Sequence, residues 1–172
     1  MNELEKLGKK YGTDKIGKHH YLPHYYEMFK DRREEVMKVL EIGVGEWAGL
    51  NMWHEFFLNS YIYGADNDRN RLGHTEVAEV FYCDQSKKES LEELLLETGF
   101  DLDLVIDDGS HKPEDQVLAC LTLMPKLSEK VTYVIEDVSD PSIVNSLVEK
   151  YATNTIECGK RYDDRLIVVK HK

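Results

Sequence analysis

The sequence has little of several features that mark whole classes of protein. Its three cysteines, Cys83, Cys120 and Cys158, share no CxxC spacing, which favours a reducing compartment and provides no zinc motif. No apolar run approaches the roughly 18 residues that a membrane span requires. The opening MNELEKLGKKYG lacks the apolar core of a secretory signal. We therefore expect a cytoplasmic protein with no membrane partner.

Basic residues are also scarce, with 22 Lys and Arg against 33 Asp and Glu, so the net charge is −11. Affinity for a polyanion comes mainly from a clustered basic surface, which makes nucleic acid a poor partner. A small molecule is the expected partner. The composition leaves the oligomeric state open, a homo-oligomer included.

Strand and helix patterns alternate through most of the 172 residues. Apolar runs typical of buried strands cover 36–43, 60–66, 103–108 and 131–137, with weaker candidates at 79–84, 153–158 and 165–171. Helical spacing falls between them at 50–58, 88–96, 114–127 and 141–151. This alternation predicts a single α/β domain of the Rossmann-like class, with a mostly parallel central sheet and helices on both faces.

Residues 1–35 fall outside this rhythm. They contain a helical start, a polar loop and an aromatic helix around Tyr25 to Phe29. We interpret 1–35 as an N-terminal helical or lid segment, and 36–172 as the Rossmann-like domain that binds the cofactor.

A glycine-rich turn follows the first predicted strand. Gly43, Gly45 and Gly49 stand where absent side chains let the backbone approach a ligand. The spacing departs from the dinucleotide pattern GxGxxG, because Ala48 occupies the sixth position. Glu46 would also repel a pyrophosphate at the helix N-terminus. The turn therefore favours a ligand without phosphate.

Three acids follow or end successive predicted strands around this turn. Glu41 suits the amino group of an amino-acid ligand, and Asp66 lies where an acid accepts ribose hydroxyl protons. Asp84 ends the next strand and could reach an adenine amino group. An adenosine that carries an amino acid and no phosphate points to S-adenosylmethionine. The simpler interpretation is that these acids only terminate strands in solvent.

Several motifs together resemble a known family. LEIGVGEWAG (40–49) resembles motif I of class I S-adenosylmethionine-dependent methyltransferases. The full set is similar to the metal-dependent sugar O-methyltransferases of macrolide biosynthesis, the mycinamicin and macrocin type. That set adds KYGTDK (10–15), the pair Met52 and Trp53, CDQS (83–86), IDDGSH (106–111) and VIEDV (134–138). The resemblance implies the class I methyltransferase fold.

The resemblance also implies a metal site and a catalytic base. Carried over onto this sequence, Asp108, Glu136 and Asp137 become the implied ligands of Mg²⁺ or Mn²⁺, and His111 the implied general base. Magnesium prefers such hard oxygen ligands. A neutral imidazole can accept a hydroxyl proton near neutral pH.

Two further assignments concern the cofactor. Thr13 lies in the motif that closes over cofactor or substrate in the family. Asp107, next to the implied ligand Asp108, is placed on the cofactor side, with a structural turn as the alternative.

The sequence thus predicts an enzyme, a magnesium- and S-adenosylmethionine-dependent O-methyltransferase acting on a hydroxyl of a small molecule such as a sugar or glycosylated metabolite. One alternative is a cofactor-binding module without catalysis. The other is an NAD-dependent dehydrogenase, which the broken GxGxxG pattern and Glu46 disfavour.

Overall fold

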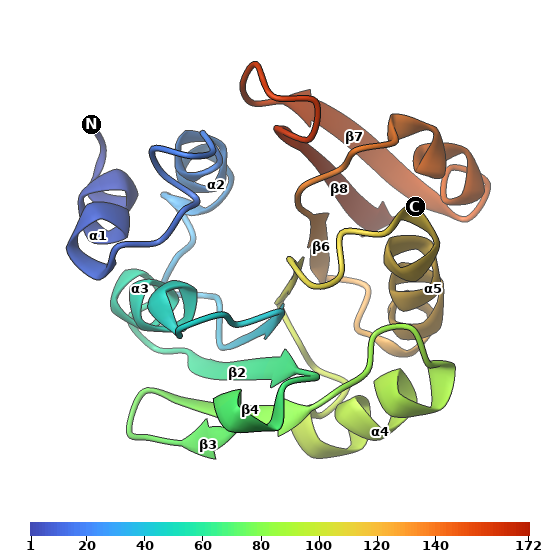
Figure 1. The fold of residues 1–172 in the computed structure, drawn as a ribbon, viewed down its shortest axis with the longest axis horizontal. Helices are drawn as coiled ribbons and strands as arrows, with labels where there is room; N and C mark the ends of the chain where they lie inside the picture. Colours follow the sequence, from blue (N-terminus) through green and yellow to red (C-terminus); the bar gives the residue numbers. More distant parts are fainter.

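The computed structural model describes residues 1–172 and contains one sheet of eight strands in the order β3-β4-β2-β1-β5-β6-β8-β7 (Figure 1). Strands β4, β2, β1, β5 and β6 are mutually parallel, while β3, β8 and β7 run antiparallel to their neighbours. The strands are β1 (Lys38–Ile42), β2 (Tyr61–Asp66), β3 (Gly73–His74), β4 (Ala78–Tyr82), β5 (Leu104–Asp107), β6 (Thr132–Ile135), β7 (Tyr151–Glu157) and β8 (Arg165–His171). The predicted mostly parallel sheet is confirmed.

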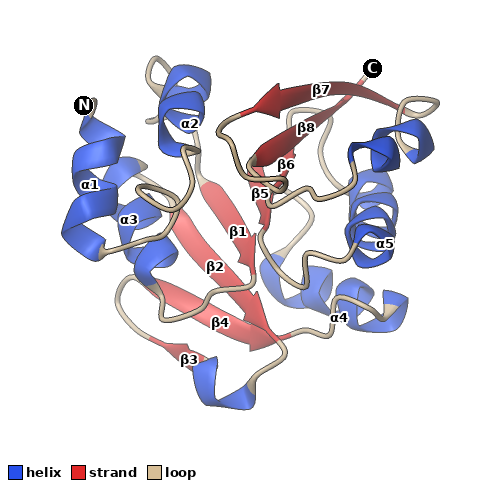
Figure 2. Ribbon diagram, turned by 45° about the horizontal axis from the view of Figure 1, so that its top comes forward, coloured by secondary structure: helices blue, strands red, loops and turns tan.

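Helices cover both faces of this sheet, as predicted (Figure 2). On one face lie α1 (Glu3–Tyr11), α2 (Leu22–Phe29) and α3 (Ala48–Phe56), and on the other α4 (Lys88–Thr98) and α5 (Pro113–Leu123). Three short 3₁₀ helices, η1 (Arg69–Arg71), η2 (Met124–Lys126) and η3 (Pro141–Ser146), complete the set. None of the helices has the length and apolar composition needed to cross a membrane.

The hydrophobic core is divided by the sheet into two clusters of 23 and 22 buried residues. Successive side chains of a strand point to opposite faces, so Leu40 of β1 joins the first cluster and Val39 the second. Val105 and Ile106 of β5 divide in the same way. Strands buried on both faces require nearly continuous apolar runs, which explains why these strands were recognisable in the sequence.

The N-terminal segment packs into the second of these cores. Leu22 and Phe29 of α2 are fully buried. The Phe29 ring meets that of Phe57 edge-on at 5.4 Å, and Tyr25 contacts Trp53 of α3 at 5.0 Å between ring centroids. The segment thus shares the core of the sheet domain, and the loop between α1 and α2 is held over the strand ends.

One predicted helix is wrong in type. Residues 141–151 form only the 3₁₀ helix η3 followed by turns, and Tyr151 already begins β7. Ser and Asn residues in this stretch are poor helix formers, and Tyr151 pairs with His171 of β8. The predicted cap is present, since Asp140 accepts a hydrogen bond from the Ser142 amide at 2.9 Å.

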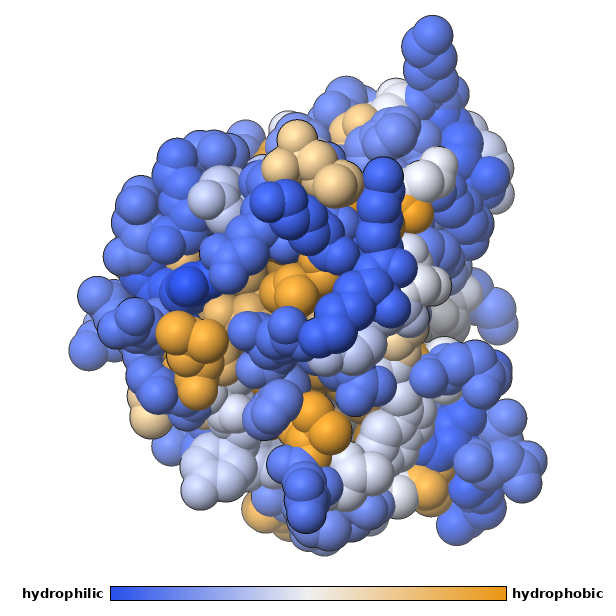
Figure 3. Space-filling view, turned by 90° about the vertical axis from the view of Figure 1, so that its left-hand side faces the viewer, coloured by the Kyte–Doolittle hydropathy of each residue, from blue (hydrophilic) through white to orange (hydrophobic).

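The face over the N-terminal helices is largely hydrophilic, with apolar groups scattered between charged ones (Figure 3). Single exposed apolar residues are normal on the surface of a folded domain and do not mark a docking surface.

We expect Phe29→Ala to lower the free energy of unfolding of the whole chain by about 3–5 kcal/mol, because it empties a fully buried aromatic site. Denaturant unfolding followed by circular dichroism measures this loss. The matched control is Glu27→Ala on the exposed side of α2, for which a change below about 0.5 kcal/mol is expected. A separate early transition in Phe29→Ala, with the main transition unmoved, would show that the N-terminal segment folds independently.

Candidate active site

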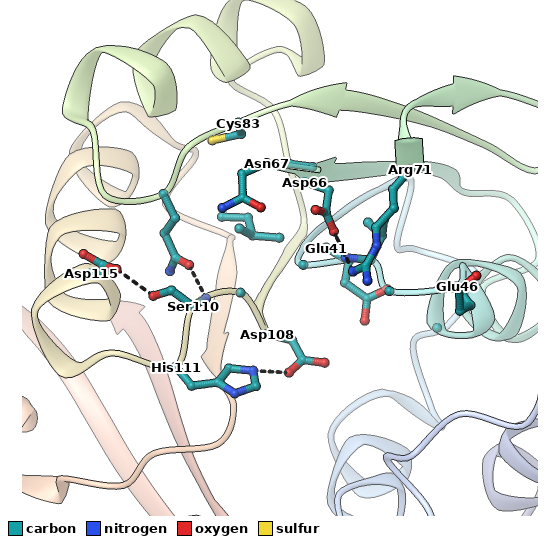
Figure 4. Close-up of a pocket in the computed structure, with 18 of the residues that line it drawn as sticks. Glu41, Glu46, Asp66, Asn67, Arg71, Cys83, Asp108, Ser110, His111 and Asp115 are labelled. Carbon is teal, nitrogen blue, oxygen red and sulfur yellow. Dashed lines mark hydrogen bonds and ion pairs between the residues drawn. The ribbon is translucent and has the colours of Figure 1, made fainter. Parts of the chain in front are cut away.

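A cavity of about 570 Å³ lies at the carboxyl ends of β1, β2, β4 and β5 (Figure 4). Ligands bind at this edge of open α/β sheets. The loop after α1 closes one side of the cavity through residues 12–15. The cavity brings together most of the predicted site residues, namely Thr13, Glu41, Gly43, Gly45, Asp66, Asp84, Asp108 and His111.

Glycine is required at position 43 for two reasons. Gly43 has φ +85°, in the left-handed region, and a Cβ atom here would lie 2.1 Å from the carbonyl oxygen of Asp108. Gly45 also has positive φ, +50°, but open space surrounds it. Gly43 therefore lets the β1–α3 turn touch the loop after β5, and Gly45 leaves the cavity wall without a side chain.

Asp66 ties the end of β2 to this turn. Its carboxylate accepts hydrogen bonds from the amides of Val44 at 3.2 Å and Asp68 at 2.8 Å. Arg71 lies 3.4 Å from the same carboxylate (Figure 4). Asp66 is only 7% exposed, so it presents a fixed acceptor to the cavity.

Asp84 follows β4 on the next side of the cavity. It forms an ion pair with Lys87 at 2.7 Å and accepts a hydrogen bond from the Ser86 hydroxyl at 2.6 Å. The bond from Lys87 is the main reason that its pKa falls to about 2. Asp84 is therefore ionised at neutral pH.

Asp107, which was expected on the cofactor side, does not line the cavity. It is fully buried and accepts hydrogen bonds from Gln85 Nε2 at 2.6 Å and the Tyr133 hydroxyl at 3.1 Å. Burial raises its pKa to about 7. Gln85 in turn accepts a hydrogen bond from the Ser110 amide at 2.9 Å. Asp107 is the last residue of β5 rather than part of a turn, and it supports the loop that carries His111 from within the core.

An imidazole and two carboxylates meet beside the cavity. Ligand atoms of Asp108, His111 and Asp137 all lie within 4.8 Å of one another. His111 Nε2 is 3.1 Å from Asp108 and Nδ1 is 3.5 Å from Asp137. The hydrogen bond with Asp108 is the main cause that raises the pKa of His111 to about 9. Both His111 (φ 58°) and Asp137 (φ 50°) adopt left-handed backbone, so strain is concentrated at this cluster.

Lys15 is a site residue that the sequence reasoning missed. Its Nζ lies 2.6 Å from Asp108, 2.6 Å from Glu136 and 3.1 Å from Glu41. Glu136 also accepts a hydrogen bond from the Tyr25 hydroxyl at 2.6 Å. The motif KYGTDK contains Lys15, but a lysine in a polar loop gives no sign that it will be buried.

The three acids predicted as metal ligands fit a magnesium ion to different degrees. Asp108 and Asp137 provide the hard oxygens that magnesium prefers, and their atoms are close enough to share one ion. Glu136, the third expected ligand, directs one oxygen to Lys15 and the other to Tyr25. The residues fit a divalent cation through Asp108 and Asp137, whereas a cation at Glu136 would have to share its oxygens with Lys15 and Tyr25.

The sheet order and the flanking helices form the class I methyltransferase fold. The chain superposes on MycE methyltransferase from mycinamycin biosynthesis, solved with Mg and SAH, with a TM-score of 0.81 at 28% identity over 99% of this chain and 55% of that one. A second MycE structure, which also contains mycinamycin VI, gives a TM-score of 0.80 at 26% identity over 99% of this chain and 54% of that one. No family model matches the chain.

More narrowly, the chain is a relative of the macrolide and sugar O-methyltransferases, which confirms the resemblance in its motifs. It is 37% identical to mycinamicin VI 2''-O-methyltransferase of Micromonospora griseorubida over 145 residues, covering 79% of this chain and 36% of the relative. It is likewise 37% identical to demethylmacrocin O-methyltransferase of Streptomyces fradiae over 144 residues, with the same coverage of 79% and 36%. The chain thus spans about a third of the length of these curated relatives.

We expect Gly43→Ala to destabilise the protein more than Gly45→Ala. Both substitutions place a Cβ in left-handed backbone, at a cost of about 1–2 kcal/mol. Only Gly43→Ala also drives that Cβ into the Asp108 backbone, which adds about 1–3 kcal/mol of overpacking. Denaturant unfolding measures both losses, and equal losses would show that the two loops are not in contact.

Proposed function

We propose that the chain is the catalytic domain of an S-adenosylmethionine-dependent, magnesium- or manganese-dependent O-methyltransferase that acts on a hydroxyl of a small molecule, such as a sugar or glycosylated metabolite. The observation that carries this proposal is His111, held between two carboxylates beside a cavity suited to the cofactor. The relatives support it, because two of them are O-methyltransferases of a rhamnosyl tetracenomycin C and of an olivosyl oleandolide.

The cavity offers a distinct group for each part of the cofactor. Glu41 and the open backbone at Gly43 and Gly45 suit the amino-acid part. Asp66 provides a fixed acceptor for ribose hydroxyls, and Asp84 an ionised acceptor for the adenine amino group. Thr13, which is 7% exposed in the cavity wall, covers the cofactor from the loop after α1.

Asp108 and Asp137 are the proposed metal ligands, with Glu136 as a third. When bound there, a divalent cation polarises a coordinated hydroxyl and offsets the charge of the two carboxylates. Those carboxylates raise the pKa of His111, so the imidazole is a competent base only when their charge is offset.

His111 is the proposed general base. It would accept the proton of the acceptor hydroxyl at a ring nitrogen, while the cavity wall holds the cofactor's methyl group in line with the hydroxyl oxygen. The oxygen–methyl bond then forms as the sulfur–methyl bond breaks. Positioning of the two reactants supplies much of the expected acceleration.

We expect S-adenosylhomocysteine to raise the melting temperature of the purified chain and NAD to leave it unchanged. A ligand at one hundred times its dissociation constant adds about 2.7 kcal/mol, which for this length corresponds to roughly 5–11 °C. Differential scanning fluorimetry with and without MgCl₂ is sufficient. A rise with NAD alone would contradict the proposed cofactor.

We expect His111→Ala to abolish methyl transfer and to leave the melting shift with S-adenosylhomocysteine nearly intact, because the base does not hold the cofactor. Transfer of labelled methyl to mycinamicin VI or demethylmacrocin measures activity. His74→Ala is the control, since His74 is 75% exposed on β3 and lies outside the cavity lining. Equal loss of transfer and of cofactor binding would contradict a base role.

A further inference from the structure

The charged residues that are buried in this protein are nearly all acidic. Lys15 is the only Lys or Arg among the buried residues, whereas seven acids are buried: Glu41, Asp66, Asp107, Asp115, Glu136, Asp137 and Asp164. A buried carboxylate is costly unless it is neutralised, hydrogen-bonded or paired with a positive charge. The position of the one buried ammonium group therefore has a large effect on its neighbours.

The Lys15 ammonium group lies where carboxylates from three adjacent strands converge. Glu41 belongs to β1, Asp108 follows β5 and Glu136 follows β6, and these strands are neighbours in the sheet. Its Nζ donates hydrogen bonds to Asp108 and Glu136 at 2.6 Å each and forms an ion pair with Glu41 at 3.1 Å. Lys15 itself is 2% exposed, so the ammonium group is shielded from solvent.

The backbone holds Lys15 in this place. Its carbonyl oxygen accepts a hydrogen bond from the Tyr21 amide at 3.2 Å, and Ile16 pairs with His20 in a β-bridge. The Tyr21 hydroxyl donates to Asp137 at 2.5 Å. The same loop therefore contacts the carboxylates on both sides of the candidate metal site.

Lys15 and a divalent cation would use the same acids. Asp108 directs Oδ2 to Lys15 and Oδ1 to the cluster with His111 and Asp137. Glu136 directs Oε2 to Lys15. A cation bound by Asp108 would thus lie close to a fixed ammonium group, and like charges in a partly buried site repel strongly.

We propose that Lys15 is a positioning residue that acts as the resident counter-ion of the strand-end carboxylates and sets an upper limit on the affinity of the site for a divalent cation. This inference rests on the metal site of the proposed function. Lys15 keeps the acids folded together before a cation arrives. Because Lys15 contacts both acids, a divalent cation would share Asp108 with it and compete with it for Glu136. The affinity of the site for the cation is therefore moderate.

The test compares Mn²⁺ binding to the wild-type chain, Lys15→Met and Lys18→Met by electron paramagnetic resonance of free Mn²⁺. Lys15→Met keeps the unbranched side chain up to the Cε position and removes the ammonium group with its charge. Lys18→Met is the control, because Lys18 is half exposed in the same loop and pairs only with Asp14. We expect Lys15→Met to bind Mn²⁺ about tenfold more tightly or better, and Lys18→Met to match the wild type.

Thermal melting gives a second readout. Without metal, Lys15→Met should melt below the wild type, because three acids lose their counter-ion, and MgCl₂ should raise its melting temperature by more than it raises that of the wild type. Equal or weaker Mn²⁺ binding by folded Lys15→Met would overturn the inference. Absence of Mn²⁺ binding in the wild type and all variants would overturn the metal dependence of the proposed function as well.

If Lys15→Met does not fold, the double variant Lys15→Met/Glu136→Gln can be compared with Glu136→Gln instead. The double variant Lys15→Met/Glu136→Gln removes one positive and one negative charge together, so the balance of buried charge is kept. It should bind Mn²⁺ more tightly than Glu136→Gln alone, because the ammonium group beside Asp108 is gone. Equal or weaker binding by the double variant would overturn the inference.

Discussion

Parallel strands that end side by side bring the groups at their carboxyl ends together, and in this protein those groups are acids. Glu41, Asp108 and Glu136 come from three neighbouring strands and converge on a single ammonium group. These acids repel one another in a region shielded from water, so their charge must be offset for the strand ends to pack side by side. The buried Lys15 meets this requirement within the protein, and the two carboxylates around His111 form the proposed cation site.

Contacts in the rest of the structure hold these charged groups in place. The absence of a side chain at Gly43 allows the β1–α3 turn to touch the loop after β5. Asp107 and Gln85 hold the far side of that loop from within the core. The helices before β1 are anchored through Phe29 and carry Lys15 to the strand ends. A buried ion pair of this kind requires the N-terminal segment to be packed against the sheet.

Local patterns were sufficient to predict the sheet, the helices on both faces and several residues that line the cavity, because buried strands and glycine turns leave signals within a few residues. Long-range pairing leaves no such signal. Lys15 lies 93 residues from Asp108 and 121 from Glu136, so its burial depends on the whole fold. Asp107 and Asp108 are adjacent in sequence, yet strand alternation points one into the core and the other to the cavity. The helix predicted for residues 141–151 was wrong because pairing of Tyr151 with β8 competed with a weak helical pattern.

The most direct test of the account is the anomalous scattering of Mn²⁺ in crystals of the chain grown with S-adenosylhomocysteine. We expect one strong peak within coordination distance, about 2.1 Å, of both Asp108 and Asp137, with the nucleoside in the cavity and its ribose on Asp66. A filled cavity without a peak at these two acids, or a peak held by other groups, would contradict the account.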